Sequence, residues 1–178
     1  SNTTANRKPF ALSASATSNL AVSFSTTSSS CAVSTQSGTT TVQIIQAGTC
    51  TITADQAGDA TYNPAPSVSQ SFTITDPAIT IIGVADMILG NPASLPVSAS
   101  SNYADPVTIT STITGACTVS GTQGSYTLTP KAAGSCTLHA ETADSANFYG
   151  TFTERTITIY DPLAATASTT LPSLTVGT

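Results

Sequence analysis

The chain has little charge, few aromatic side chains and no tryptophan. Charged residues make up 7% of its 178 residues and aromatic residues 6%. The formal net charge is −5, and only four residues are basic. Nucleic-acid-binding surfaces need clustered lysines and arginines to neutralise phosphates, so this composition excludes a nucleic-acid partner. Glu, Lys, Arg and Met, which favour helices, are also scarce, so a helical protein is not expected.

Long apolar runs and targeting signals are lacking as well. The longest apolar stretch, residues 79–89, is interrupted by Thr80, Gly83 and Asp86. A membrane-spanning helix needs about 20 apolar residues, so no membrane insertion is expected. No secretory signal peptide is visible, so an exported protein would correspond to a mature or excised chain.

Hydroxyl and apolar side chains dominate what remains. About a third of the residues are Ser or Thr, and 39% are hydrophobic. The apolar residues alternate with Ser and Thr in short runs such as 22–25, 51–54, 137–140 and 157–159. Such alternation predicts strands with one apolar face, and the Gly-, Asn- and Pro-rich tracts between them predict turns. The pattern therefore indicates an antiparallel β-sandwich and opposes disorder.

The four cysteines reveal an internal repeat. Cys31 and Cys50 are 19 positions apart, as are Cys117 and Cys136, and the second pair follows the first by 86 positions. The flanking residues repeat too: each pair begins with Cys-x-Val-Ser and ends with Ala-Gly-Thr/Ser-Cys. A period this long matches a whole small domain, so the chain is expected to contain two tandem modules.

Disulfides are the better explanation for these cysteines. Metal sites usually contain closely spaced Cys pairs, whereas these intervals are wide and the chain has one histidine. Four cysteines allow three pairings, and the repeat favours Cys31 with Cys50 and Cys117 with Cys136. Closing a loop of this size stabilises by about 3 kcal/mol in the chain-entropy model. Disulfides predict a secreted or cell-surface protein; the alternative is four buried free thiols in the cytosol.

An Asp-Pro pair marks the boundaries between modules. Asp76 and Pro77 recur as Asp161 and Pro162. Because proline restricts the preceding residue to extended conformations, the joint should be short and fairly stiff. We expect a first module at 1–75, a second at 76–161 and a tail at 162–178.

The two ends of the chain differ from the repeat. The second module opens with a strong strand pattern at 79–84, whereas the first has only the polar residues 1–8 in that place. The tail carries a strand-like run at 171–177. Either the chain is cut from a longer array, or the tail of one copy completes the first module of the next, as in fibres built by strand donation. The second explanation predicts a subunit interface at Leu163, Ala165, Leu171, Leu174 and Val176.

Three stretches resemble a known family. Residues 9–14, 31–34 and 47–62 are similar to the bacterial Ig-like tandem repeats of large surface and secreted proteins. The run Ala-Gly-Thr-Cys-Thr-Ile-Thr-Ala at 47–54 carries most of the likeness, and the second repeat keeps it in part at 133–138. The resemblance implies two tandem Ig-like β-sandwiches and a role as a stalk, spacer or adhesive array. It brings no catalytic residues.

Candidates for chemistry are sparse. His139 is the single histidine, and no nucleophile elbow accompanies it, so no catalytic site is expected. The acidic candidates for a metal are Asp55, Asp59, Asp76, Glu141, Asp144 and Asp161. They form no calcium-loop pattern, so we expect no metal and no cofactor, with calcium at a joint as the alternative.

The aromatic residues suggest two structural features, a tyrosine corner and an exposed patch. Tyr62 resembles the buried tyrosine corner of β-sandwiches. Tyr103, Phe148, Tyr149 and Phe152 could form an exposed patch.

Taken together, these features predict a non-catalytic extracellular stalk or filament subunit. Its expected partners are other copies of itself, joined head to tail, with surface glycans as a further candidate. The alternatives are an adhesion module that binds carbohydrate or a host protein, and a spacer excised from a larger surface protein or enzyme.

Overall fold

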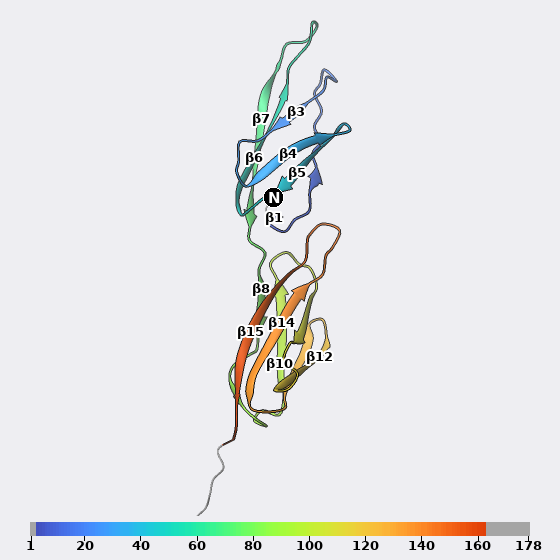
Figure 1. Ribbon diagram of the computed structural model, residues 1–178. Coiled ribbons are helices and arrows are strands. Elements are labelled where there is room, and N and C mark those ends of the chain that lie inside the picture. The colour runs from blue at the N-terminus through green and yellow to red at the C-terminus, as the bar shows by residue number, and fades with distance from the viewer. Residues whose placement is uncertain (1–2, 163–178) are drawn as a thin grey trace, which may run out of the picture.

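The protein consists of two elongated β-sandwiches arranged end to end (Figure 1). The computed structural model describes residues 3–162, in which all regular elements are strands. Within that part of the chain, no helix is long and apolar enough to cross a membrane.

The second sandwich shows the complete strand set. Its strands are β8 (Ile79–Ile82), β9 (Met87–Ile88), β10 (Leu95–Ser101), β11 (Val107–Ser111), β12 (Cys117–Thr122), β13 (Ser125–Pro130), β14 (Gly134–Thr142) and β15 (Thr151–Tyr160). One sheet has the order β12-β13-β10-β8 and the other β11-β14-β15-β9. Two facing sheets of four strands each, with the first strand divided between them as β8 and β9, form an immunoglobulin-like arrangement.

The division of the first strand depends on Gly83. β8 pairs antiparallel with β10, after which the chain crosses over and β9 pairs parallel with β15. Gly83 lies between them with a φ of +87°, and a Cβ there would come within 2.6 Å of the carbonyl oxygen of Pro96. Glycine adopts this backbone conformation without steric cost, so the crossover is possible at this position.

The first sandwich repeats this topology with one strand fewer. Its strands are β1 (Thr3–Thr4), β2 (Phe10–Ala11), β3 (Ser23–Ser25), β4 (Cys31–Gln36), β5 (Thr39–Ile44), β6 (Gly48–Gln56) and β7 (Ala65–Thr75). They form sheets of order β2-β5-β4 and β1-β7-β6-β3. β1 pairs parallel with β7 as β9 does with β15, but residues 3–162 contain no counterpart of β8 in this sandwich. The predicted fold class, two Ig-like β-sandwiches, is confirmed.

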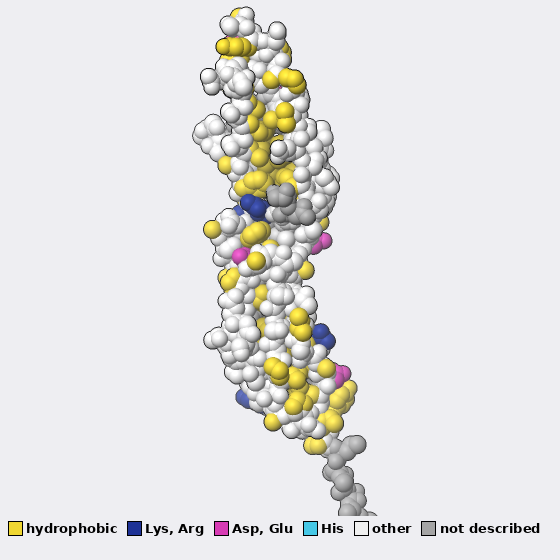
Figure 2. All heavy atoms as spheres, turned by 180° about the vertical axis from the view of Figure 1, so that it is seen from behind, with side chains coloured by type: hydrophobic (Ala, Val, Ile, Leu, Met, Phe, Trp, Pro, Cys, Tyr) yellow, Lys and Arg dark blue, Asp and Glu magenta, His cyan; other side chains and the backbone are white. Residues whose placement is uncertain are grey.

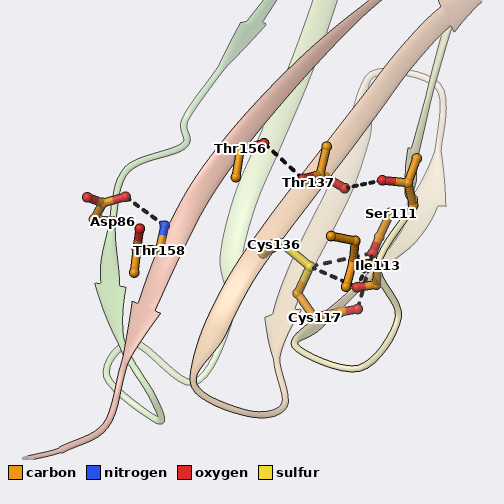
Figure 3. Close-up of a disulfide and its surroundings, with 9 residues drawn as sticks. Asp86, Ser111, Ile113, Cys117, Cys136, Thr137, Thr156 and Thr158 are labelled. Carbon is orange, nitrogen blue, oxygen red and sulfur yellow. Dashed lines mark hydrogen bonds between the residues drawn. A yellow bond between two sulfur atoms is a disulfide. The ribbon is translucent and has the colours of Figure 1, made fainter.

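A buried disulfide ties the two sheets of each sandwich together. Cys31 opens β4 and bonds to Cys50 in β6, and Cys117 opens β12 and bonds to Cys136 in β14. These are the two pairings that the repeat favoured. Figure 3 shows the second disulfide, where the Ser111 hydroxyl donates to the carbonyl oxygen of Cys117 at 3.2 Å. The disulfide thus lies between the two sheets, next to a side-chain hydrogen bond.

The joint between the sandwiches is held from two sides. Asn102 donates its side-chain amide to the Asp76 carbonyl oxygen at 2.9 Å and accepts the Ala78 N–H at 3.0 Å. On the other side, the Lys8 N–H donates to the carbonyl oxygen of Asn147 and the Tyr149 N–H to that of Asn6, both at 2.7 Å. These bonds connect the start of the first sandwich to a loop of the second, so the short joint is braced.

Candidate functional site

The feature that separates the two sandwiches is the place occupied by β8. In the second sandwich β8 runs beside β10, and Ile79, Thr80 and Ile81 pair with Ser101, Ser100 and Ala99. Ile81 is buried, as is Val84 just beyond the strand, and Ile79 packs against the same core. β8 therefore closes both the edge of its sheet and the side of the core.

In the first sandwich the matching edge is open. Phe10 pairs with Val42 as Leu95 pairs with Leu128, so β2 corresponds to the start of β10. The residues after β2, 13–16, then correspond to 98–101, which pair with β8 in the second sandwich. Among the described residues, no strand pairs with residues 13–16. An unpaired edge of this kind is a template for an added strand.

An apolar groove follows this open edge. It has a volume of about 530 Å³ and runs between residues 12–16 and the face of β6 and β7. Its apolar walls come from Phe10, Leu12, Ala14, Val22, Phe24, Ile52 and Phe72, among others. Figure 2 shows hydrophobic side chains gathered in a strip along the first sandwich.

Side chains around the groove are more exposed than their counterparts in the second sandwich. Val97, Ile109 and Ile157 are all 3% exposed, whereas the corresponding residues are only half-buried. Those corresponding residues are Leu12, Phe24 and Phe72. The first core accordingly contains six buried residues and the second fifteen. The first core is therefore incompletely packed on the side that β8 covers in the second sandwich.

The groove carries few charges. Arg7 and Asp55 are the charged residues that line it. The Asp55 carboxylate accepts a hydrogen bond from the Ser67 hydroxyl, and the Arg7 guanidinium lies 4.5 Å from the centre of the Phe10 ring. Both charges thus have partners within the sandwich, so the groove favours an uncharged segment with apolar side chains on one face.

The predicted subunit-interface residues, Leu163, Ala165, Leu171, Leu174 and Val176, lie outside the described residues. The described chain ends at Pro162, at the end of the second sandwich farthest from the first (Figure 1).

His139 lies among carboxylates and away from the groove. Its ring nitrogens lie 3.1 Å from Glu154 and 3.5 Å from Glu141, and its ring stacks on Phe152. Among the described residues, no group of three or more His, Cys, Asp or Glu is placed to hold a metal ion.

Sequence reasoning placed Tyr62 wrongly. The residue is 50% exposed in a turn between β6 and β7. The Asp59 carboxylate accepts the N–H groups of Thr61 and Tyr62, both at 2.8 Å. This turn keeps the ring out of the core, so Tyr62 is not a buried tyrosine corner.

The four aromatic residues considered as an exposed patch are divided between two environments. Tyr103 and Phe148 pair at the joint, with ring centroids 5.2 Å apart, and the Arg7 guanidinium lies 5.9 Å from the Phe148 ring. Tyr149 and Phe152 are exposed. The contacts of Arg7 with the joint were not foreseen, because no sequence pattern links residues so far apart.

The chain is similar in structure to several solved proteins. No protein-family model matches the chain, and no curated protein matches it. The chain is similar to the D00-D0 domain of intimin, with 13% identity, a TM-score of 0.45, and coverage of 90% of this chain and 95% of that one. It is also similar to domains 1-6 of surface layer protein SbsC, with 16% identity, a TM-score of 0.34, and coverage of 82% and 20%.

A further neighbour is a SusE-like, surface-located polysaccharide-binding protein from the heparin utilisation locus of Bacteroides thetaiotaomicron. It has 11% identity and a TM-score of 0.36, with coverage of 90% of this chain and 32% of that one. These neighbours are Ig-like domains of bacterial surface proteins, whereas the narrower resemblance to tandem-repeat adhesins stays a prediction.

Proposed function

We propose that this protein is a non-catalytic subunit of an extracellular stalk or filament, and that residues 163–178 of one copy fill the groove of the next. The observation that carries the proposal is the open groove of the first sandwich, at the place where β8 completes the second. An inserted strand would add backbone hydrogen bonds along residues 13–16 and bury apolar side chains against Leu12 and Phe24. Each side chain so buried contributes about 1.5–3 kcal/mol.

The chemistry of the tail suits this role. Residues 163–178 contain no charged side chain and include the apolar residues Leu163, Leu171, Leu174 and Val176. A strand presents alternate side chains to one face, so Leu174 and Val176 would face the groove together. The lack of charge matches a groove whose own charges already have partners.

The geometry favours donation between copies. The described chain leaves the second sandwich at the end opposite the first, as Figure 1 shows. To reach the groove of its own first sandwich, the tail would have to return along β15, which is ten residues or about 33 Å long. A head-to-tail contact between different surfaces does not close on itself unless it forms a ring, so it generates a filament.

The disulfides support the extracellular setting. Both pairs of cysteines are oxidised and buried, an arrangement that persists in secreted and surface proteins. Each sandwich contains its own disulfide, and hydrogen bonds brace the joint between the sandwiches. Together they form a durable extended unit, which suits a mechanical role.

Sedimentation velocity on the full chain tests the proposal. The wild-type protein should form a series of oligomers that grows with concentration. A Leu174→Asp/Val176→Asp variant should remain a monomer, whereas Thr169→Asp/Thr170→Asp, which adds the same charge to the same segment, should still assemble. Equal assembly of both variants, or a wild-type monomer at every concentration, would overturn the proposal. A tail-independent binding to glycans or host protein would instead favour an adhesion module.

A further inference from the structure

We propose that the run 174–176 of the tail takes the places of Ile79, Thr80 and Ile81 beside residues 14–16 of the next copy. This inference rests on the proposed function and deepens it, because it fixes the register of the donated strand. It follows from three observations: the pairing of β8, the identity of the side chains that β8 buries, and the position of Pro172.

The pairing of β8 defines what the groove requires. Ile79 and Ile81 face the core, while Thr80 between them is exposed on the other side of the sheet. The occupant must therefore supply two large apolar side chains two positions apart, separated by a residue that tolerates solvent.

Leu174, Thr175 and Val176 reproduce that order of side chains. The other interface pair in the tail, Leu163 and Ala165, supplies one large and one small side chain, which would leave a void against the half-buried Phe24. Tail residues before 173 are further constrained by Pro172, because proline has no N–H to donate to a ladder. A paired segment that begins after Pro172 avoids this loss.

The counterpart residues then set the cross-strand pairs. Ser101, Ser100 and Ala99 pair with Ile79, Thr80 and Ile81. The equivalent positions in the first sandwich are Ala16, Ser15 and Ala14. The register therefore pairs Ala16 with Leu174, Ser15 with Thr175, and Ala14 with Val176.

The register also fixes the length of the joint between two copies. Three residues, 76–78, separate β7 from β8 inside the chain, whereas thirteen, 161–173, would separate β15 from the donated run. Thirteen extended residues span up to about 45 Å. The joint between subunits is therefore less constrained than the joint inside them.

Cysteine crosslinking in the full chain tests the register. Ser15 is exposed in the first sandwich, and Thr80, whose place Thr175 takes, is exposed in the second, so cysteines at 15 and 175 should join without disturbing the core. Residues directly opposite in an antiparallel pair have Cα atoms about 4.5–5.5 Å apart, within the range that a disulfide spans. The matched control is Ser15→Cys/Ala164→Cys, which would crosslink if Leu163 and Ala165 filled the groove.

We expect Ser15→Cys/Thr175→Cys to give a ladder of intermolecular species on a non-reducing gel, with the 15–175 linkage identified by mass spectrometry, and the control to give no ladder. A ladder from the control alone would overturn this register and leave strand donation standing. Failure of both variants to crosslink while sedimentation still shows oligomers would also overturn the register. Failure of both with a monomeric wild type would overturn the proposed function as well.

Discussion

Ile81 in β8 pairs with Ala99 in β10, and its side chain is 7% exposed. Ala14, the counterpart of Ala99, has no such partner within residues 3–162 and lines the groove. The same fold is therefore present twice, once with its first strand in place and once with that place open.

The contribution of β8 to the free energy of unfolding can be measured in the second sandwich. Ile81→Ala should destabilise the second sandwich by about 2–4 kcal/mol, because it leaves a cavity at a buried core position. The measurement is urea denaturation followed by NMR signals of the second sandwich. Ile82→Ala is the matched control: Ile82 is 55% exposed on the opposite face, so its change should stay within about 0.5 kcal/mol.

A charge in the groove should block assembly without unfolding the sandwich. Ala14 is exposed in the described chain and faces the groove, so Ala14→Asp should fold normally yet reject an apolar strand. Circular dichroism checks the fold, and sedimentation checks assembly. Ser15→Asp places the same charge one residue along, at the position whose counterpart Ser100 is exposed even with β8 in place. If Ala14→Asp assembled as well as Ser15→Asp, the groove would not be the binding site.

The disulfides should matter most in the first sandwich. Replacing both Cys31 and Cys50 by Ala should cost about 3 kcal/mol from loop closure, and so should replacing Cys117 and Cys136. The first core has six buried residues against fifteen in the second, so the first sandwich has less stability to lose. Urea titration of the two double variants should show the first sandwich unfolding at room temperature and the second persisting. The reverse order would contradict this ranking.

The joint should loosen in acid. The Gly150 N–H donates to the Asp144 carboxylate at 2.7 Å and, with the Lys8 ammonium 3.4 Å away, lowers the pKa of Asp144 below its ordinary range. A depressed pKa means that the contact contributes fully above the ordinary value, about 3.9, and is lost as the pH falls through the lowered value. Small-angle scattering between neutral pH and about pH 2 should therefore show a broader range of angles between the sandwiches.

Asp144→Asn is the control for this pH dependence. The amide still accepts the Gly150 N–H but carries no charge for Lys8, so the joint angle should vary less with pH than in the wild type. An equal pH response in both proteins would exclude Asp144 as its cause.

Much of this architecture could be predicted from the sequence, because repeats and alternation are local signals. The equal intervals between Cys31 and Cys50 and between Cys117 and Cys136 indicated the repeat and favoured the pairings found. Alternating Ile and Thr residues indicated β8, and its lack of a counterpart pointed to the open edge.

Other features have no signal in the repeat or in the alternation of apolar residues. Thr3 and Thr4 form β1 although both are polar, because their backbones pair with β7. The contact of Arg7 with Phe148 exists only once the two sandwiches are joined. Tyr62 was misplaced because a local Asp59 turn, not the pattern of apolar residues, decides where its ring lies.

Cryo-electron microscopy of the native assembled protein would show directly whether one copy donates a strand to the next. We expect filaments with a two-sandwich repeat, in which an added strand lies beside residues 13–16 and connects to Pro162 of the neighbouring copy. A groove that is empty, or filled by a strand continuous with the N-terminal end of the same first sandwich, would contradict strand donation.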